Sequence, residues 1–230
     1  MLRYQTGETK TEYVYPNKID TTHYVINGYY QNGRIFFNGN VRNGKFIGKK
    51  ISYHENGKIK ELDSLFGPCD LLNSNCDALV KRFNDKGVIN QIFTVKNGKL
   101  NGKSSLFDSS GNLTVTYESI DGKKNGILIS YFSNGVIASK ENYKNDSVQD
   151  LSIHYNDKGD TIRMVLNNEK HTEFLYFERL KNGFILRGNI PIYRGYELWT
   201  WEDQSGKLIK RKIRKTKSSL IPQNLIPPKM

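Results

Sequence analysis

The stretch Lys50-Ile51-Ser52-Tyr53-His54-Glu55-Asn56-Gly57-Lys58-Ile59 contains the unit that the rest of the chain repeats: an aromatic residue, a glycine four positions later, and an aliphatic residue two positions after that. We call this glycine the marker glycine. It returns at intervals of 24, 30, 24, 24 and 24 residues, together with its aromatic residue. A fixed period of this size is typical of arrays in which each repeat buries its apolar surface only against its neighbours.

The glycine-containing turn signals within each period predict two turns and two strands. Asn-Gly at the marker glycines Gly33, Gly57 and Gly135 predicts a two-residue hairpin turn with positive φ at both positions. A second turn signal follows 11 residues after the marker, with a further glycine at 15. Three repeats have glycine at both places: Gly44 and Gly48, Gly98 and Gly102, and Gly122 and Gly126. The last two repeats have other residues there: Asp146 and Asp150, and Lys170 and Phe174. An antiparallel meander follows from this order.

The predicted fold is all-β, an elongated single-layer antiparallel meander of about six to seven consecutive β-hairpin repeats. Strand segments such as Ile127–Tyr131 alternate apolar and polar residues, and no segment has helical periodicity. We expect residues 1–22 to form a partly ordered N-terminal arm and residues 23–171 the repeat array. Residues 172–217 read as degenerate hairpins that cap the array, and residues 218–230 as an extended or disordered end.

One aromatic residue per repeat occupies the same position, four residues before the marker glycine. These residues are Tyr29, Tyr53, Phe83, Phe107, Tyr131 and Tyr155. We expect them to line up along the sheet as its packing spine, because cross-strand aromatic rows stabilise sheets. The alternative is an exposed aromatic groove for a sugar or a peptide.

The single long interval results from an insertion at residues 67–76, which contains both cysteines, Cys69 and Cys76. Two interpretations stay open: a disulfide that closes this short loop, which implies an oxidising compartment, or two reduced thiols. Their spacing, with no second cysteine pair, does not match a zinc site. The insertion is also a candidate binding loop, since interrupted arrays often bind at the interruption.

Positive charge is concentrated near the C-terminus. The chain has a formal net charge of +12, and residues 207–217 contain seven lysines and arginines with no acidic residue. The candidate partner-binding residues are Lys210, Arg211, Lys212, Arg214 and Lys215, which suit an acidic protein or an anionic membrane surface. The simpler interpretation is that they protect an exposed edge strand from pairing. Positive charge at one end only argues against a nucleic-acid binder.

The sequence lacks a recognisable catalytic constellation. The histidines, His23, His54, His154 and His171, occupy unrelated positions of the repeat, so we do not expect them to converge. Nucleophile elbows, phosphate-binding glycine loops and paired metal-ligand motifs are missing from the sequence. We therefore predict that the chain is not an enzyme and that it has no cofactor and no metal site.

The opening residues have no hydrophobic segment, and no run of 18 apolar residues occurs. The chain as given therefore predicts a cytoplasmic protein that does not span a membrane. If an upstream signal has been removed, the alternative is an exported or envelope-associated protein.

The segments Tyr30–Ile35 and Asn43–Lys60 resemble the bacterial MORN-variant repeat, whose units read approximately Tyr-x-x-Asn-Gly-x-x-x and Tyr-x-Asn-Gly-x-x-x-Gly-x-x-x-x-Tyr. The resemblance covers about residues 25 to 170. It implies a non-catalytic protein-binding scaffold, such as the antitoxin or immunity component of a toxin–antitoxin module, with a toxin-like partner. The alternative function is an envelope or surface module that binds glycan or anionic lipid, and the oligomeric state stays open.

Overall fold

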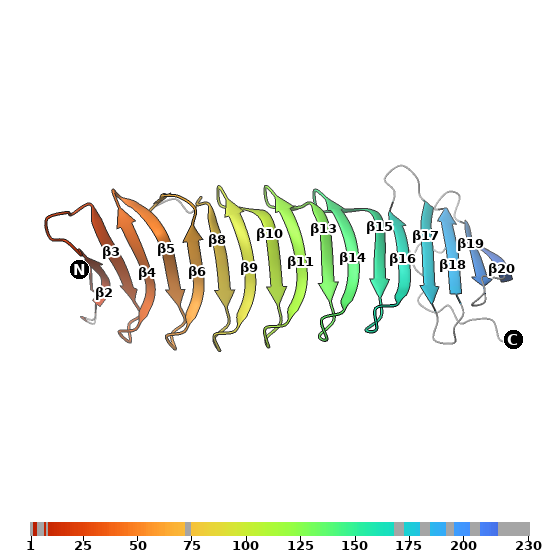
Figure 1. Cartoon of the computed structure of the whole chain (residues 1–230), viewed down its shortest axis with the longest axis horizontal. Coiled ribbons are helices and arrows are strands. Elements are labelled where there is room, and N and C mark those ends of the chain that lie inside the picture. Colours follow the sequence, from red (N-terminus) through yellow and green to blue (C-terminus); the bar gives the residue numbers. More distant parts are fainter. Residues whose placement is uncertain are drawn as a thin grey trace. The chain divides into compact units, whose positions relative to one another are not determined.

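The structure is a computed structural model of the chain, shown in Figure 1. It describes residues 2–3, 7, 9–71, 75–167, 173–179, 185–191, 196–202 and 208–215. The described elements are all strands, and they form a single open antiparallel sheet of consecutive hairpins, which confirms the predicted fold class. The chain divides into two compact units, Met1–Lys124 and Asn125–Met230.

In the first unit, the strands mostly follow one another in antiparallel pairs. They are β1 (Leu2–Arg3), β2 (Thr9–Val14), β3 (His23–Tyr29), β4 (Ile35–Arg42), β5 (Lys45–Tyr53), β6 (Ile59–Leu65), β7 (Cys69–Asp70), β8 (Ala78–Phe83), β9 (Ile89–Lys96), β10 (Lys99–Phe107), β11 (Leu113–Ile120) and β12 (Lys123–Lys124). The predicted insertion interrupts this order. Its short strand β7 pairs with β5, and β6 pairs directly with β8.

The second unit continues the same pattern, each strand pairing with the next. Its strands are β13 (Gly126–Tyr131), β14 (Ile137–Lys144), β15 (Ser147–Tyr155), β16 (Thr161–Asn167), β17 (Glu173–Arg179), β18 (Ile185–Pro191), β19 (Tyr196–Glu202) and β20 (Leu208–Lys215). Strands thus occupy part of the predicted cap at 172–217. Lys170, His171 and the predicted tail at 218–230 lie outside the described residues.

The marker turns differ from the predicted two-residue turns. Only the glycine has positive φ, as at Gly33 with φ of 79°, and the preceding Asn32 does not. Gly33 N–H donates to the carbonyl of Tyr30 (2.9 Å), and Tyr30 N–H donates to that of Arg34 (2.7 Å), which leaves a three-residue loop between them. The asparagine has another function: Asn32 Oδ1 accepts from Arg34 N–H. The predicted geometry was wrong here because a three-residue loop needs a left-handed residue only at its last position.

The second set of turns adopts the geometry that was predicted for the first. Asn43 and Gly44 both have positive φ, 50° and 72°, and strand residues Arg42 and Lys45 face each other across them. Asn145 and Asp146 keep this conformation, with φ of 50° and 69°, although the glycine has been lost. A left-handed backbone disfavours residues with a Cβ atom, so this repeat keeps the turn at the cost of local backbone strain.

The repeated aromatic and aliphatic positions meet across each marker turn. Tyr53 at the end of β5 pairs with Ile59 at the start of β6, and a register shift follows between Ser52 and Tyr53. The same pairing and shift occur in the other copies, through to Tyr155 and Thr161. The sequence period therefore corresponds to a repeated bulge that ends each strand pair at its loop.

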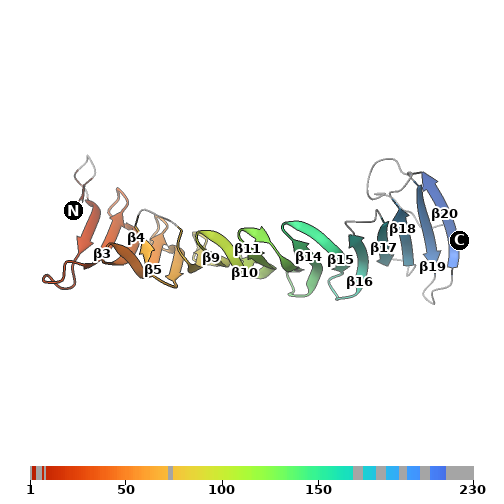
Figure 2. The ribbon, with the colours of Figure 1, turned by 90° about the horizontal axis from the view of Figure 1, so that it is seen from above.

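A cluster of buried apolar side chains lies on one face of β8 and β9. Ala78, Val80 and Phe93 form the buried cluster, and Leu65, Val95 and Leu100 pack against it. Val80 stands opposite Phe93, which in turn stands opposite Ser104 on β10. Seen from above in Figure 2, the strands of the first unit form one layer. Its apolar core is therefore a thin patch on a sheet face.

Side chains also connect successive marker turns along one edge of the sheet. Asn56 Nδ2 donates to the carbonyl of Asp85 (2.7 Å), and Lys58 Nζ donates to that of Lys86 (2.7 Å). In the second unit, Asn134 Nδ2 donates to the carbonyl of Asp157 in the same way (2.9 Å). Each of these turn-to-turn bonds joins a side chain of one repeat to the backbone of the next.

Candidate interaction surface

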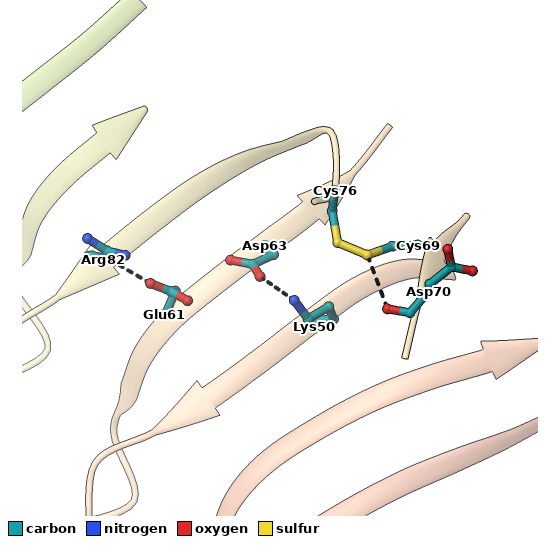
Figure 3. Close-up of polar contacts among 7 residues, drawn as sticks. All are labelled: Lys50, Glu61, Asp63, Cys69, Asp70, Cys76 and Arg82. Atoms are coloured by element: carbon teal, nitrogen blue, oxygen red, sulfur yellow. Dashed lines mark hydrogen bonds and ion pairs between the residues drawn. A yellow bond between two sulfur atoms is a disulfide. The ribbon is translucent and has the colours of Figure 1, made fainter. Parts of the chain in front are cut away.

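Four charged residues of β5, β6 and β8 lie on one face of the first unit. Lys50 on β5 stands directly opposite Asp63 on β6, and Glu61 on β6 stands directly opposite Arg82 on β8. Figure 3 shows the two pairs side by side, with the acid of each pair on β6. We call Lys50, Asp63, Glu61 and Arg82 the charged strip.

Both pairs have short contacts. Lys50 Nζ lies 3.0 Å from Asp63 Oδ2, and Arg82 Nε lies 2.6 Å from Glu61 Oε2. The first pair is the more enclosed, since the Asp63 side chain is only 14% exposed. Burial raises the pKa of Asp63, and the hydrogen bond from Lys50 acts against this rise. Asp63 Oδ1 is buried and has no hydrogen-bond partner among the described residues.

Aromatic rings lie beneath both cations. The guanidinium carbon of Arg82 is 4.8 Å from the ring centre of Phe93, and Lys50 Nζ is 5.6 Å from that of Phe46. A cation held over an aromatic face gains electrostatic attraction from the ring quadrupole. The strip therefore has two acids on β6 with a cation on each side, and the ordered side chains limit the entropy that a binding partner would have to remove.

A shallow pocket opens between the strands at the strip. It is lined by Phe37, Lys50, Ile51, Ser52, Glu61 and Asp63, and its volume is about 100 Å³. Metabolite sites usually have volumes of roughly 300–1,000 Å³. This pocket can therefore accept a single side chain of a partner, but it is too small to enclose a sugar or a nucleotide.

The second unit carries ionisable residues at corresponding repeat positions. Glu141 occupies the position of Asp63, six residues after its marker glycine, and His154 occupies that of Arg82. Tyr143 O–H donates to Glu141 Oε2 (2.8 Å), and burial together with this bond raises the pKa of Tyr143 to about 12. Burial, and then the positive charge of Arg163, lower the pKa of His154. His154 is therefore mostly neutral at pH 7, because the lowered pKa moves its titration further below neutral pH.

The predicted aromatic spine is half-buried in every copy. Its members, Tyr29, Tyr53, Phe83, Phe107, Tyr131 and Tyr155, are neither fully buried nor exposed. The buried apolar side chains lie elsewhere, at Val41 on β4 and in the cluster of Ala78, Val80 and Phe93. The row is therefore only partly covered along both units.

The other predicted residues fall at two separate places. Lys210, Arg211, Lys212, Arg214 and Lys215 all lie on β20, whose backbone pairs with β19. Their side chains lie outside the described residues. Cys69 and Cys76 are joined by a disulfide, with Cα atoms 5.4 Å apart, and both are buried.

The sequence interpretation missed the charged strip, although the repeat contains a signal for it. Pairing Tyr53 with Ile59 across Gly57 sets the hairpin register, and that register places Lys50 opposite Asp63. Opposite charges at facing positions are a known stabilising pair. The signal is weak because the other repeats carry different residues at these positions, such as Leu128 opposite Glu141.

The histidines of the described region do not form a metal centre. His54 Nε2 lies 3.0 Å from the carbonyl oxygen of Phe83 and thus connects two neighbouring repeats. Within the part of the chain that the structure describes, three or more potential metal ligands do not cluster anywhere. The same residues include no helix long and apolar enough to cross a membrane.

Comparison with known proteins gives one family match. No curated protein matches this chain. The model of the MORN repeat variant matches residues 47–64, which include most of β5 and most of β6, and residues 124–145, which include β13 and β14. MORN repeats are generally protein- or membrane-binding repeats. The chain thus contains the MORN repeat variant in two stretches, one centred on the hairpin that carries Lys50 and Asp63 and the other on the hairpin that carries Glu141.

Proposed function

We propose that this chain is a non-catalytic scaffold that binds another protein through the face carrying the charged strip and through the basic strand β20. The single observation that carries the proposal is the charged strip, because its four side chains are ordered against each other and against two aromatic rings. Preordered charge gives specificity at low entropic cost. The MORN repeat variant supports the same class of function.

The partner that we propose is a toxin-like protein with an acidic surface, which makes the chain an antitoxin or immunity protein. The resemblance of the repeats to those of such proteins and the positive charge of β20 support this assignment. Residues Lys210 to Lys215 contribute five cations within six positions of one strand. An acidic surface would meet them with favourable long-range attraction, which raises the rate of association.

The experiment is co-expression of the full chain with the product of a neighbouring toxin gene, followed by isolation of the complex. We expect a stable complex and loss of toxicity. The double variant Arg211→Glu and Lys212→Glu should weaken binding at least tenfold, and more at low salt than at high salt. The matched control is Lys60→Glu with Lys103→Glu, two exposed lysines elsewhere. Equal binding by both double variants would contradict the assignment of β20.

A second candidate function is an envelope module that binds glycan or anionic lipid. The bonded cysteine pair favours it, because disulfides persist mainly in oxidising compartments. Sedimentation with vesicles of anionic phospholipid, compared with neutral vesicles, tests the lipid form. Binding to anionic vesicles that is abolished by Arg211→Glu and Lys212→Glu would favour this function over the toxin-binding one.

A further inference from the structure

The insertion occupies the place of a turn. In the hairpin of β9 and β10, strand residues Lys96 and Lys99 close directly over the two-residue turn of Asn97 and Gly98. Between β6 and β8, Leu65 pairs with Ala78 and Phe66 N–H donates to the carbonyl of Asp77 (2.9 Å). Beyond this last bond, the inserted residues replace the turn, and Cys69 and Cys76 are bonded across them.

One arm of the insertion is attached to the preceding hairpin. Cys69 and Asp70 form β7, which pairs with Phe46 and Lys45 of β5. Lys45 Nζ lies 3.3 Å from Asp70 Oδ1, as an exposed ion pair that adds little stability. The backbone pairing is therefore the main attachment. In it, β7 pairs with the start of β5, which β6 does not reach.

The other arm is attached to the following hairpin. Gly98 N–H donates to the carbonyl of Cys76 (3.4 Å), and Asn97 N–H donates to Asp77 Oδ1 (2.7 Å). Asn75 packs closely on Gly98, since a Cβ atom there would lie 2.6 Å from Asn75 Oδ1. The disulfide between Cys69 and Cys76, drawn in Figure 3, thus joins an arm paired with β5 to an arm bound to the turn between β9 and β10.

We propose that the Cys69–Cys76 disulfide is a redox-sensitive clasp that holds three successive hairpins together. A dithiol reductant would cleave the sulfur–sulfur bond, supply two electrons and two protons to give two cysteine thiols, and itself become a disulfide. Each arm would then keep its own contacts with its neighbouring hairpin but would lose the covalent bond to the other arm. The attachments at Lys45–Phe46 and Asn97–Gly98 would open more often, while the hairpins themselves stay folded.

The reactivity of the clasp follows from its burial. Cys69 and Cys76 are 5% and 7% exposed, so a thiolate can reach the sulfur atoms only during a local opening. Reduction should therefore be slower in the folded protein than in denaturant. The clasp would stay closed through brief contact with a reductant and open on sustained exposure.

The test is hydrogen exchange of the full chain, oxidised and after reduction with dithiothreitol. We expect the amides of residues 45–46 and 97–98 to exchange at least fivefold faster after reduction. The internal control is the turn of Asp121 and Gly122, which has the same geometry and whose Gly122 N–H donates to the carbonyl of Leu100 (2.8 Å). Its exchange should not change. Unchanged exchange at both clasp segments would overturn the proposal.

A double variant, Cys69→Ser with Cys76→Ser, separates the bond from any other effect of the reductant. It should show the fast exchange without dithiothreitol and should not respond to it. Protection at Gly122 reports whether the variant is folded. If it is not, the comparison of oxidised and reduced wild-type protein still decides. Two alkylatable thiols in the native protein isolated without reductant would also overturn the proposal, because the clasp would then not exist.

Discussion

Lys50 and Asp63 stand directly opposite each other on β5 and β6, with 3.0 Å between Nζ and Oδ2. The pair is mostly enclosed, and the second oxygen of Asp63 has no hydrogen-bond partner in the described part of the chain. Such a carboxylate depends on its single cation, because an uncompensated buried charge is costly. This dependence leads to a prediction about stability and pH.

Replacing the cation by Lys50→Met should lower the free energy of unfolding by roughly 1–3 kcal/mol at pH 7, because Asp63 keeps its charge without compensation. Removing Lys50 raises the pKa of Asp63 further. A carboxyl with a raised pKa favours folding when protonated, and this contribution is lost as pH increases through its folded pKa. The loss in the variant should therefore be smaller at pH 4 than at pH 7.

The measurement is urea denaturation at both pH values. Lys49→Met is the matched control, because Lys49 is the exposed neighbour on the same strand, and it should change stability by less than about 0.5 kcal/mol. A loss for Lys50→Met that is equal at the two pH values would contradict the role of Asp63.

Two buried serines should respond in opposite directions to alanine. Ser104 is 2% exposed, and its hydroxyl has no hydrogen-bond partner among the described residues. Ser139 is also buried, but its hydroxyl lies 2.7 Å from that of Ser130. Ser104→Ala should raise the free energy of unfolding by up to about 1 kcal/mol, and Ser139→Ala should lower it by about 1 kcal/mol. Thermal unfolding of the two variants tests this, and equal effects would refute it.

Restoring a glycine at the degenerate turn should stabilise the second unit. Asp146 has φ of 69°, a conformation that costs about 1 kcal/mol for a residue with a Cβ atom. Asp146→Gly should therefore raise the free energy of unfolding by about that amount. The control is Asp157→Gly, in a marker turn where only Gly159 is left-handed. This change should destabilise slightly, because it adds backbone freedom to the unfolded chain. Destabilisation by Asp146→Gly would contradict the expectation.

The turn-to-turn bond of Asn56 can be separated from its local bond. Asn56 Oδ1 accepts from Lys58 N–H within its own turn (3.0 Å), and its Nδ2 donates to Asp85 in the next. In the described residues, Asn32 makes only the local bond, to Arg34 N–H. Asn56→Ala should cost about 1 kcal/mol more than Asn32→Ala. Equal losses in urea denaturation would mean that the bond to Asp85 contributes nothing.

The sequence predicts the strands and their order well, because each marker glycine fixes a loop and every repeat except the last, which has Thr161, places an aliphatic residue six positions after its aromatic residue. Tyr53 and Ile59 meet as this spacing requires. The turn types could not be assigned in the same way. Asn32-Gly33 and Asn43-Gly44 are the same dipeptide, and the loop length decides whether the asparagine is left-handed.

The candidate site was less predictable than the fold. The other repeats do not have a lysine and an aspartate at the positions of Lys50 and Asp63, so the sequence period does not reveal this pair. Only the hairpin register shows that the two residues face each other. The attachments of the disulfide-bonded insertion could also be found only from the three-dimensional structure. The spacing of Cys69 and Cys76 allowed a bond, but the pairing of Cys69 with Phe46 and the bond from Gly98 to Cys76 determine where the two arms lie.

The turn-to-turn bonds end on main-chain carbonyls, which every amino acid possesses. Asn56 and Lys58 therefore hold their neighbour regardless of the side chains at Asp85 and Lys86. A module joined in this manner can be duplicated, deleted or exchanged by recombination without matching substitutions in the adjoining copy. Such a chain can vary its length and diversify its faces through evolution while the joints between modules stay the same.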